Sequence, residues 1–314
     1  MTEQPPGRAC PAGYRYGAQA LAAAAALHVD TLWVAGGLYG NVFALERLLE
    51  LFDLEPGSKA LVFNGDFHWF DVDPRLFGEV NRRVLEHHAT RGNVETELAA
   101  PAAGAGCGCA YPAWVDDADV ARSNRIIERL RETARRLPQA VATLAALPMH
   151  LVAQIGDERV GVVHGDAESL AGWGFSQEVL ASAAGARAAH EACARAGVRV
   201  FASSHSCLPV LQRLDADCAI INNGAAGMPN FAGTHFGLAT RISVRPGRRP
   251  LYGARAGRLW IEAAALEYDA AAWERAFVAQ WPPGSDAYRS YYRRIALGPR
   301  YACEQALRAA EAVT

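Results

Sequence analysis

Short hydrophobic runs alternate along this chain with segments whose apolar residues recur at helical spacing. The short runs, each predicted to form a strand, lie at residues 31–35, 60–63, 150–154, 159–163, 198–202, 209–214, 218–221, 235–244 and 258–268. The helical spacing predicts helices over residues 18–27, from 41 to about 52, and over 73–88, 117–137, 138–147, 183–196 and 270–279. This mixture predicts a single α/β (α+β) domain.

The run at residues 60–63 ends abruptly in Asn64-Gly65-Asp66. Such an ending is typical of a buried strand that places a carboxylate at the carboxyl-terminal edge of a sheet, where open α/β sheets form their sites. Gly65 permits a tight turn, and Asp66 offers a hard oxygen ligand. The alternative is that Asp66 only caps the next turn. Taken alone the stretch slightly favours that alternative, so the other strand ends decide the matter.

Four further strand ends carry glycines and polar residues. In chain order they are Gly37-Leu38-Tyr39-Gly40-Asn41, Gly92-Asn93, His164-Gly165 and Ser204-His205-Ser206-Cys207, followed by the loop Asn222-Asn223-Gly224-Ala225. Each one alone has a plain structural explanation, since glycine pairs usually mark turns and a lone strand-end histidine is more often structural than a ligand. Their common position at strand ends is what indicates a site.

Composition and charge narrow the class of protein. Of the 314 residues, 51% are hydrophobic and 20% charged, and the formal net charge is −2. Without a basic surplus, neither nucleic acid nor an anionic membrane is expected as the main partner. This composition and near-neutral charge fit an enzyme with a small-molecule substrate as well as a binding module, and they do not distinguish the two.

The seven cysteines are scattered and odd in number. They form no disulfide framework, which favours a reducing cytoplasm. Cys107-Gly108-Cys109 is spaced too tightly for a usual zinc knuckle. No stretch is apolar for long enough to span a membrane, and the weakly apolar residues 18–27 indicate a helix rather than a signal peptide.

As an ordered set, the five strand ends resemble those of the calcineurin-like metallophosphoesterase superfamily, particularly its small bacterial YfcE-like and diadenosine-tetraphosphatase-like branches. The resemblance covers roughly residues 32–229, with a plausible extension to 268. It implies a four-layer α-β-β-α sandwich with a metal centre at the strand ends. We therefore expect a domain over residues 31–270, preceded by an extension with a helix (1–30) and followed by a helical tail (271–314).

The resemblance assigns a ligand set for one metal ion. Asp66 matches the carboxylate that bridges two ions in the superfamily, and Asn93, His164 and His205 match the remaining ligands of the second metal. A carboxylate, an amide oxygen and two imidazoles suit Mn, Fe or Zn. We expect one such divalent ion per chain.

The other metal position is depleted. Its Asp and His fall on Gly37 and Tyr39, its last His on Cys207, and the general-acid histidine of the superfamily on Val94. Only Asp66 and the Cys207 thiolate would remain as ligands there. The departures from the superfamily pattern thus fall on residues that would bind the metal or donate the proton, and not on peripheral residues.

Nearby residues offer substitutes for the lost groups. We predict His68 as a proton donor and Tyr39 as a phosphate contact, with Asp71 and Glu95 as further candidates. By resemblance, Asn41, with Gly40 beside it, is expected at the substrate. His68 is alternatively a surface residue on a turn. A soft site made by Cys107, Cys109 and Cys207 is a weaker hypothesis.

Two functions stay open at this stage. The first is metal-dependent hydrolysis of a phosphomonoester or phosphodiester by metal-activated water in a cytoplasmic enzyme, with a small phosphorylated substrate. The second is a catalytically inactive relative that binds a phosphate-bearing ligand or a protein partner. We favour the first because burying His and Asp without a metal or partner would be costly. A purely scaffolding role explains none of the strand ends.

Overall fold

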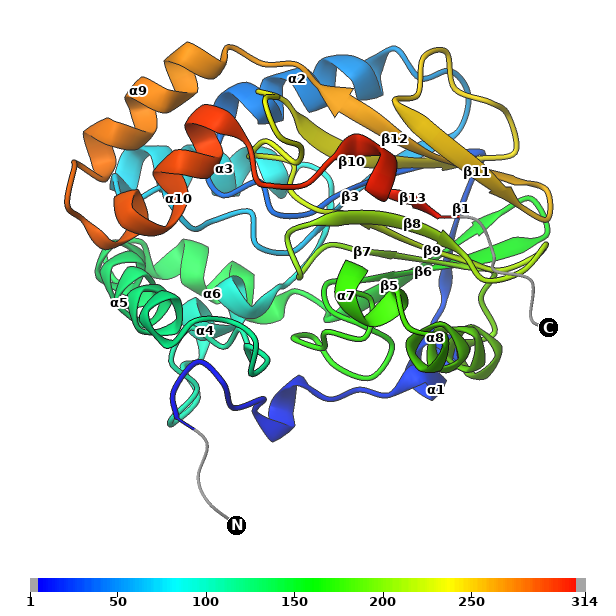
Figure 1. Ribbon diagram of the computed structural model, residues 1–314, viewed down its shortest axis with the longest axis horizontal. Coiled ribbons are helices and arrows are strands. Elements are labelled where there is room, and N and C mark those ends of the chain that lie inside the picture. The colour runs from blue at the N-terminus through cyan, green and yellow to red at the C-terminus, as the bar shows by residue number, and fades with distance from the viewer. Residues whose placement is uncertain (1–4, 309–314) are drawn as a thin grey trace.

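Two β-sheets lie face to face at the centre of the computed structural model, which describes residues 5–308 (Figure 1). The six-stranded sheet has the order β11 (Tyr252–Ala256), β12 (Leu259–Leu266), β10 (Gly237–Ser243), β2 (Thr31–Ala35), β3 (Lys59–Asn64) and β4 (His88–Thr90). The seven-stranded sheet has the order β1 (Ala26–Val29), β5 (His150–Ile155), β6 (Glu158–Val163), β7 (Val200–Ser203), β9 (Ala219–Asn223), β8 (Pro209–Arg213) and β13 (Leu307–Arg308).

The central strands of each sheet run parallel. β2 pairs with β3 and β3 with β4 in one sheet, and β6 pairs with β7 and β7 with β9 in the other. Parallel neighbours end at the same edge, so the loops that follow them lie together. The Asn64 Nδ2 amide donates to the Val163 carbonyl at 3.0 Å and ties β3 to β6 across the two sheets at this edge.

Alternate residues of β2 and β3 point to opposite faces of the sheet. Val34 and Val62 pack in the core between the two sheets, whereas Trp33 and Phe63 pack in the cluster beneath the outer helices. Burial of each such apolar side chain stabilises the fold by about 1.5–3 kcal/mol. Strands that are buried on both faces read as continuous hydrophobic runs, which is why the sequence pattern locates them.

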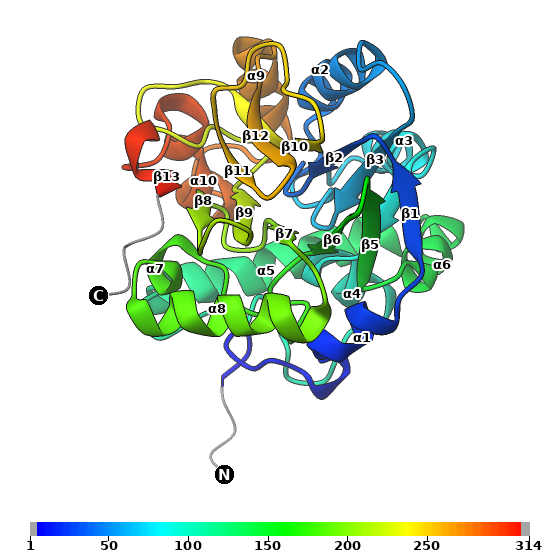
Figure 2. The same cartoon turned by 90° about the vertical axis from the view of Figure 1, so that its right-hand side faces the viewer.

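Helices cover both outer faces. On the six-stranded side lie α2 (Val42–Asp53), α3 (Pro74–Val84) and α9 (Ala270–Gln280), and on the seven-stranded side lie α1 (Ala18–Ala23) and α8 (Ala183–Ala196) (Figures 1 and 2). Near the strand-end loops lie α4 (Asn93–Ala99), α5 (Asp117–Ala134), α6 (Pro138–Ala146), α7 (Gln177–Leu180) and α10 (Asp286–Leu297). The predicted four-layer α-β-β-α sandwich is confirmed.

The ends of the chain join the sheets more closely than the sequence predicts. The helix predicted over residues 18–27 stops at Ala23, and β1 follows it and pairs with β5 at a sheet edge. The tail likewise supplies β13 beside β8. These short strands depend on pairing with distant strands, which no local pattern records. Residues 1–4 and 309–314 of the predicted extension and tail lie outside the described residues.

Two internal elements also differ from the prediction. β11 was not predicted, and no helix was predicted over α4. Both elements are short, so neither offers a long periodic pattern. Within residues 5–308, no helix combines the length and the apolar character needed to cross a membrane.

Candidate metal centre

The loop after β3 has a backbone that only glycine allows at its first position. Gly65 has φ +91°, and a Cβ there would lie 2.6 Å from Gly92 Cα and 2.7 Å from His164 Nδ1. Asp66 follows in the left-handed region at φ +52°. The close approach of the two loops brings the Asp66 carboxylate to within 3.3 Å of His164 Nε2.

Four predicted ligands converge at this point from loops of both sheets. His164 Nε2 lies 3.2 Å from Asn93 Oδ1 and 3.1 Å from His205 Nδ1, in addition to its contact with Asp66. Ligand atoms of Asp66, His164 and His205 all lie within 4.8 Å of one another and are buried. Ligands at about 2.1 Å from a tetrahedral ion are separated by about 3.4 Å. We call these four residues the metal half of the site.

The two histidines are oriented by backbone carbonyls. His164 Nδ1 lies 2.8 Å from the Asn64 carbonyl oxygen, and His205 Nε2 lies 3.0 Å from that of Cys109. A carbonyl only accepts, so each of these outer nitrogens carries the proton and donates it. The inner nitrogens, 3.1 Å apart, are then free to bind a cation through their lone pairs. Metal-bound histidines in proteins are held in the same way.

Asn93 and Asp66 are oriented by similar contacts. The Asn93 Nδ2 amide donates to the Cys107 carbonyl at 3.0 Å, which turns the amide oxygen toward His164. The Val94 backbone N–H donates to Asp66 Oδ1 at 3.1 Å. All four side chains are therefore fixed by partners outside the centre, which keeps their ligand atoms pointing inward.

Charge in the metal half favours one ionised carboxylate and one neutral imidazole. Burial opposes ionisation of Asp66, but the His164 and His205 rings hold the pKa of its carboxyl below the ordinary value. Burial also opposes a charge on His164, but the Asp66 carboxylate outweighs it and raises the pKa of that ring. Burial and the neighbouring His164 lower the pKa of His205 to about 3. The donor set fits a divalent cation, which a carboxylate and neutral imidazoles bind.

Glu95 supports the centre from beneath. Its fully buried carboxylate accepts from the backbone N–H groups of Asp66 and Gly92, both at 2.8 Å, and of Phe67 at 3.0 Å. Burial raises the pKa of this carboxyl. Glu95, predicted as a possible substitute for a lost catalytic group, thus holds the two ligand-bearing loops together. It does not line the cavity that opens beside these ligands and is described below.

The position that the resemblance assigns to the other metal contains Tyr39 and Cys207, whose side chains are hydrogen-bonded to each other. The Tyr39 hydroxyl lies 2.9 Å from Cys207 Sγ, and both residues have a positive φ, +55° and +60°. Within residues 5–308, Cys207 does not belong to the metal-binding group of Asp66, His164 and His205. The role of Cys207 as a ligand at the depleted position stays a prediction. We call Tyr39 and Cys207 the Tyr–Cys half of the site.

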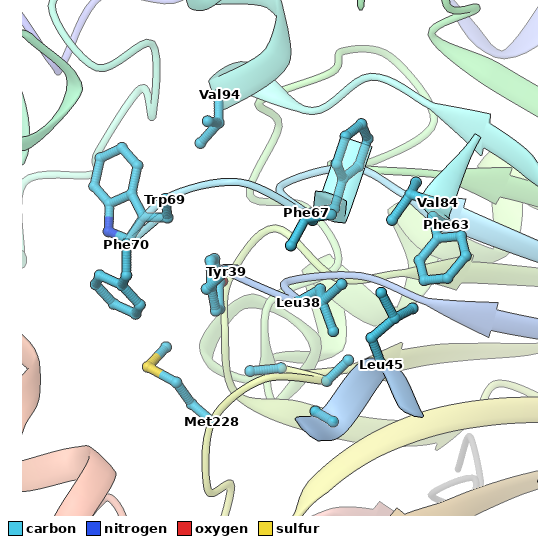
Figure 3. Close-up of a cluster of buried hydrophobic side chains, with 14 of the residues drawn as sticks. Leu38, Tyr39, Leu45, Phe63, Phe67, Trp69, Phe70, Val84, Val94 and Met228 are labelled. Carbon is cyan, nitrogen blue, oxygen red and sulfur yellow. The ribbon is translucent and has the colours of Figure 1, made fainter. Parts of the chain in front are cut away.

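Tyr39 combines a buried ring with a hydroxyl at the cavity. The ring packs in the hydrophobic cluster shown in Figure 3, with Phe70 at 5.8 Å between ring centroids. Burial raises the pKa of Tyr39 well above the ordinary value, and the Cys207 thiol beside it adds to the effect. The phenol therefore stays protonated at neutral pH and can donate a hydrogen bond.

His68, predicted as the proton donor, lies away from the cavity. The ring is fully buried and stacks on Phe77 at 3.7 Å between ring centroids. Its Nδ1 lies 2.5 Å from Asp71 Oδ2, and its Nε2 lies 3.4 Å from Asn81 Oδ1. Both nitrogens thus have partners within the protein, so the geometry does not support a catalytic role for His68 or its partner Asp71.

The residues predicted at the substrate serve the backbone instead. The Asn41 side chain caps α2 by accepting from the N–H groups of Phe43 and Ala44, and it donates to the Gly227 carbonyl. Gly40 has φ +78°, and a Cβ there would meet the Asp71 side chain at 2.6 Å. Neither residue lines the cavity at the metal half, and the sequence pattern could not separate a cap from a ligand contact.

A cavity of about 280 Å³ opens at the two halves of the site. Tyr39 and Cys207 line it together with Asp66, Asn93 and His205 of the metal half, whereas His164 is not among the lining residues. The rest of the wall consists of Trp69, Val94, Cys109, Tyr111, Val115, Asp119, Ser123, Trp173, Ser206, Ser290, Tyr291 and Arg294. Sequence reasoning missed most of this wall, because it comes from α5, α10 and loops that carry no strand-end signal. Cys109 and Cys207 both line the cavity, but with Cys107 they form no cysteine metal site among the described residues.

Comparison with known proteins identifies the fold. No protein-family model and no curated protein sequence matches this chain. Among solved structures, a metallophosphoesterase from Sphaerobacter thermophilus is similar with a TM-score of 0.57 and 17% identity, covering 86% of this chain and 100% of its own. A hypothetical protein from Pyrococcus horikoshii OT3 is similar with a TM-score of 0.56 and 17% identity, covering 87% and 100%. The chain has the fold of the metallophosphoesterases, as predicted from its strand ends.

Proposed function

We propose that this protein is a phosphoesterase that depends on one divalent metal ion, held by Asp66, Asn93, His164 and His205. The observation that carries the proposal is the pair of inner imidazole nitrogens, 3.1 Å apart, whose outer N–H groups are both committed to carbonyls. Two lone pairs at that distance repel each other unless a cation or a proton lies between them. The adjacent carboxylate and amide oxygens favour a metal cation.

The chain's own residues position the ion and offer a hydrogen-bond donor to the substrate. Mn, Fe or Zn suits the donor set, and such an ion, when bound, lowers the pKa of a water molecule and polarises a phosphoryl oxygen. The protonated Tyr39 hydroxyl is available to donate to a phosphoryl oxygen once it leaves Cys207. Trp173 and Tyr111 form part of the cavity wall.

A second candidate function is ligand binding without turnover. The hydrogen bond between Tyr39 and Cys207 favours this second function. By resemblance, the tyrosine and the thiol, whose pKa is raised, replace ligands of a second ion. The cavity wall also contains no histidine besides His205 among the described residues. In this case the substrate would bind at the single ion and stay intact.

Metal analysis and a substrate screen separate the candidates. Purified protein is analysed by inductively coupled plasma mass spectrometry and then assayed with p-nitrophenyl phosphate and bis-p-nitrophenyl phosphate in the presence of Mn. One ion per chain together with metal-dependent hydrolysis supports the phosphoesterase. One ion without hydrolysis of any phosphoester supports the binding protein. Failure to bind any divalent ion contradicts both.

A further inference from the structure

The cavity contains a fixed guanidinium that the metal half does not use. Arg294 lies on α10, and its Nε donates to the Pro229 carbonyl at 2.9 Å. Its Nη2 donates to the Cys207 carbonyl at 2.7 Å and lies 3.4 Å from Asn230 Oδ1. These contacts hold the guanidinium beside the Tyr–Cys half and leave Nη1 without a hydrogen-bond partner among residues 5–308.

The charge of Arg294 has no counter-ion in the described part of the chain. All three of its acceptors are neutral, and the described residues place no carboxylate within 4.0 Å of it. The other acidic residue of the wall, Asp119, is already bonded to Arg122 at 2.5 Å and to Ser290 at 3.0 Å. A half-buried cation without a counter-ion is costly, and an anionic ligand removes the cost.

The positive charges of the site would balance the negative charges of a phosphomonoester. A divalent ion together with the Asp66 carboxylate leaves one positive charge, and the Arg294 guanidinium adds a second. The second pKa of a phosphate ester is about 6, so at neutral pH a monoester carries close to two negative charges and a diester only one. Arginine also presents a planar fork that matches two phosphate oxygens.

We propose that Arg294 is the second cationic group of the phosphate site, and that the cavity takes a small phosphomonoester dianion between Arg294 and the metal half. This inference rests on the proposed function for the presence of the ion. The organic group of the ester would lie against the aromatic and apolar wall formed by Trp69, Tyr111, Trp173, Tyr291, Val94 and Val115. The volume of about 280 Å³ favours a group the size of one ring.

The test measures binding, and any turnover of phenyl phosphate is recognised as a steady heat after each injection and subtracted. Isothermal titration calorimetry with inorganic phosphate, phenyl phosphate and diphenyl phosphate is carried out on the metal-loaded wild type, Arg294→Gln and Arg294→Lys. We expect Arg294→Gln to weaken phenyl phosphate binding by roughly 10- to 100-fold, and diphenyl phosphate binding by clearly less. Arg294→Lys keeps the charge without the fork and should fall between. Arg293→Ala removes an exposed arginine of the same helix and should change binding by less than about 2-fold.

The outcomes separate this inference from the proposed function. Thermal unfolding and metal content of each variant show whether the chain is folded and loaded. Equal phenyl phosphate affinity in wild type and folded Arg294→Gln overturns the role of Arg294 while leaving a metal-dependent phosphoesterase intact. A wild type that binds no metal, yet binds phosphate through Arg294, overturns the proposed function and supports the anion site. Stronger binding of the diester than of the monoester overturns the assignment of a dianion.

Discussion

The metal half and the Tyr–Cys half of the site both lie in loops that follow strands, and they differ in what their side chains do. In the metal half, side chains from both sheets direct lone pairs to one point, and each is held by a partner outside the centre. In the Tyr–Cys half, the hydroxyl of Tyr39 and the thiol of Cys207 form a hydrogen bond with each other. Both halves include residues with positive φ, so the strained backbone is common to them.

This difference teaches that the backbone scaffold and the chemistry of the site are separable. Both halves have turns with positive φ, yet among residues 5–308 only Asp66, His164 and His205 form a group that could hold a metal ion. The other half keeps a protonated phenol, a thiol whose pKa is raised by burial, and a guanidinium. The second positive charge is thus supplied by the protein itself under our proposal.

The largest effect is expected from His164→Ala. His164 Nε2 contacts all three other ligands, so its loss should weaken metal binding by more than about 100-fold, since outer partners alone contribute 10- to 100-fold. Metal content by mass spectrometry and hydrolysis in the presence of Mn report the result. His190→Ala is the matched control, because His190 is half-exposed on α8 and pairs with Asp215. Metal retained in His164→Ala would disprove the assignment.

His68→Ala tests the histidine in the loop after β3, which is fully buried and hydrogen-bonded to Asp71. The change leaves the fully buried Asp71 carboxylate without its partner, and we expect a loss of about 3–5 kcal/mol in the free energy of unfolding. Metal content per folded chain should stay at the wild-type value. Urea unfolding and metal analysis measure the two quantities. Loss of metal from the folded variant would mean that His68 contributes to the centre after all.

Gly65→Ala tests the close approach of the loops that both halves share. The new Cβ would lie 2.6 Å from Gly92 Cα in a backbone with φ +91°, so we expect destabilisation by about 3 kcal/mol and loss of metal. Gly78→Ala is the control, because a Cβ on this residue of α3 meets nothing within 4 Å. Alanine in a helix is favoured over glycine, and this variant should gain about 0.5–1 kcal/mol. Equal unfolding midpoints for the two variants would refute the steric argument.

The smallest effect is expected from Tyr39→Phe. The change removes one hydroxyl–thiol contact and should cost about 1 kcal/mol or less in unfolding free energy, with metal content unchanged. Cys207→Ser, which keeps a hydrogen-bonding group, should also retain the metal. If either variant lost its ion, the two halves would form a single metal site, and the distinction between them would be wrong.

Much of the fold was predictable because its central strands are buried on both faces. The runs that became β2, β3, β6 and β7 are largely apolar, and each is followed by a loop rich in glycine and polar residues. β1, β11 and β13 were not predicted, because these short strands lie at sheet edges and gain their order from pairing with distant partners.

Sequence alone determined the strand ends, the fold that they specify and the identity of four ligand candidates. Ligand type and strand-end position are local properties, and the parallel order of strands brings such positions to one edge. The resemblance of these strand ends to those of the metallophosphoesterases predicts Asp66, Asn93, His164 and His205 as ligands, and the structure brings the four side chains together.

Only the tertiary structure decided which polar residues face the cavity and which face the core. His68 and Asn41 have the same side-chain types as residues of the metal half, but they are hydrogen-bonded to Asp71, Asn81 and Gly227. Arg294 had no sequence signal at all, because it enters the site from a helix about 87 residues beyond Cys207. Orientation and long-range proximity are set by packing, and a one-dimensional pattern does not contain them.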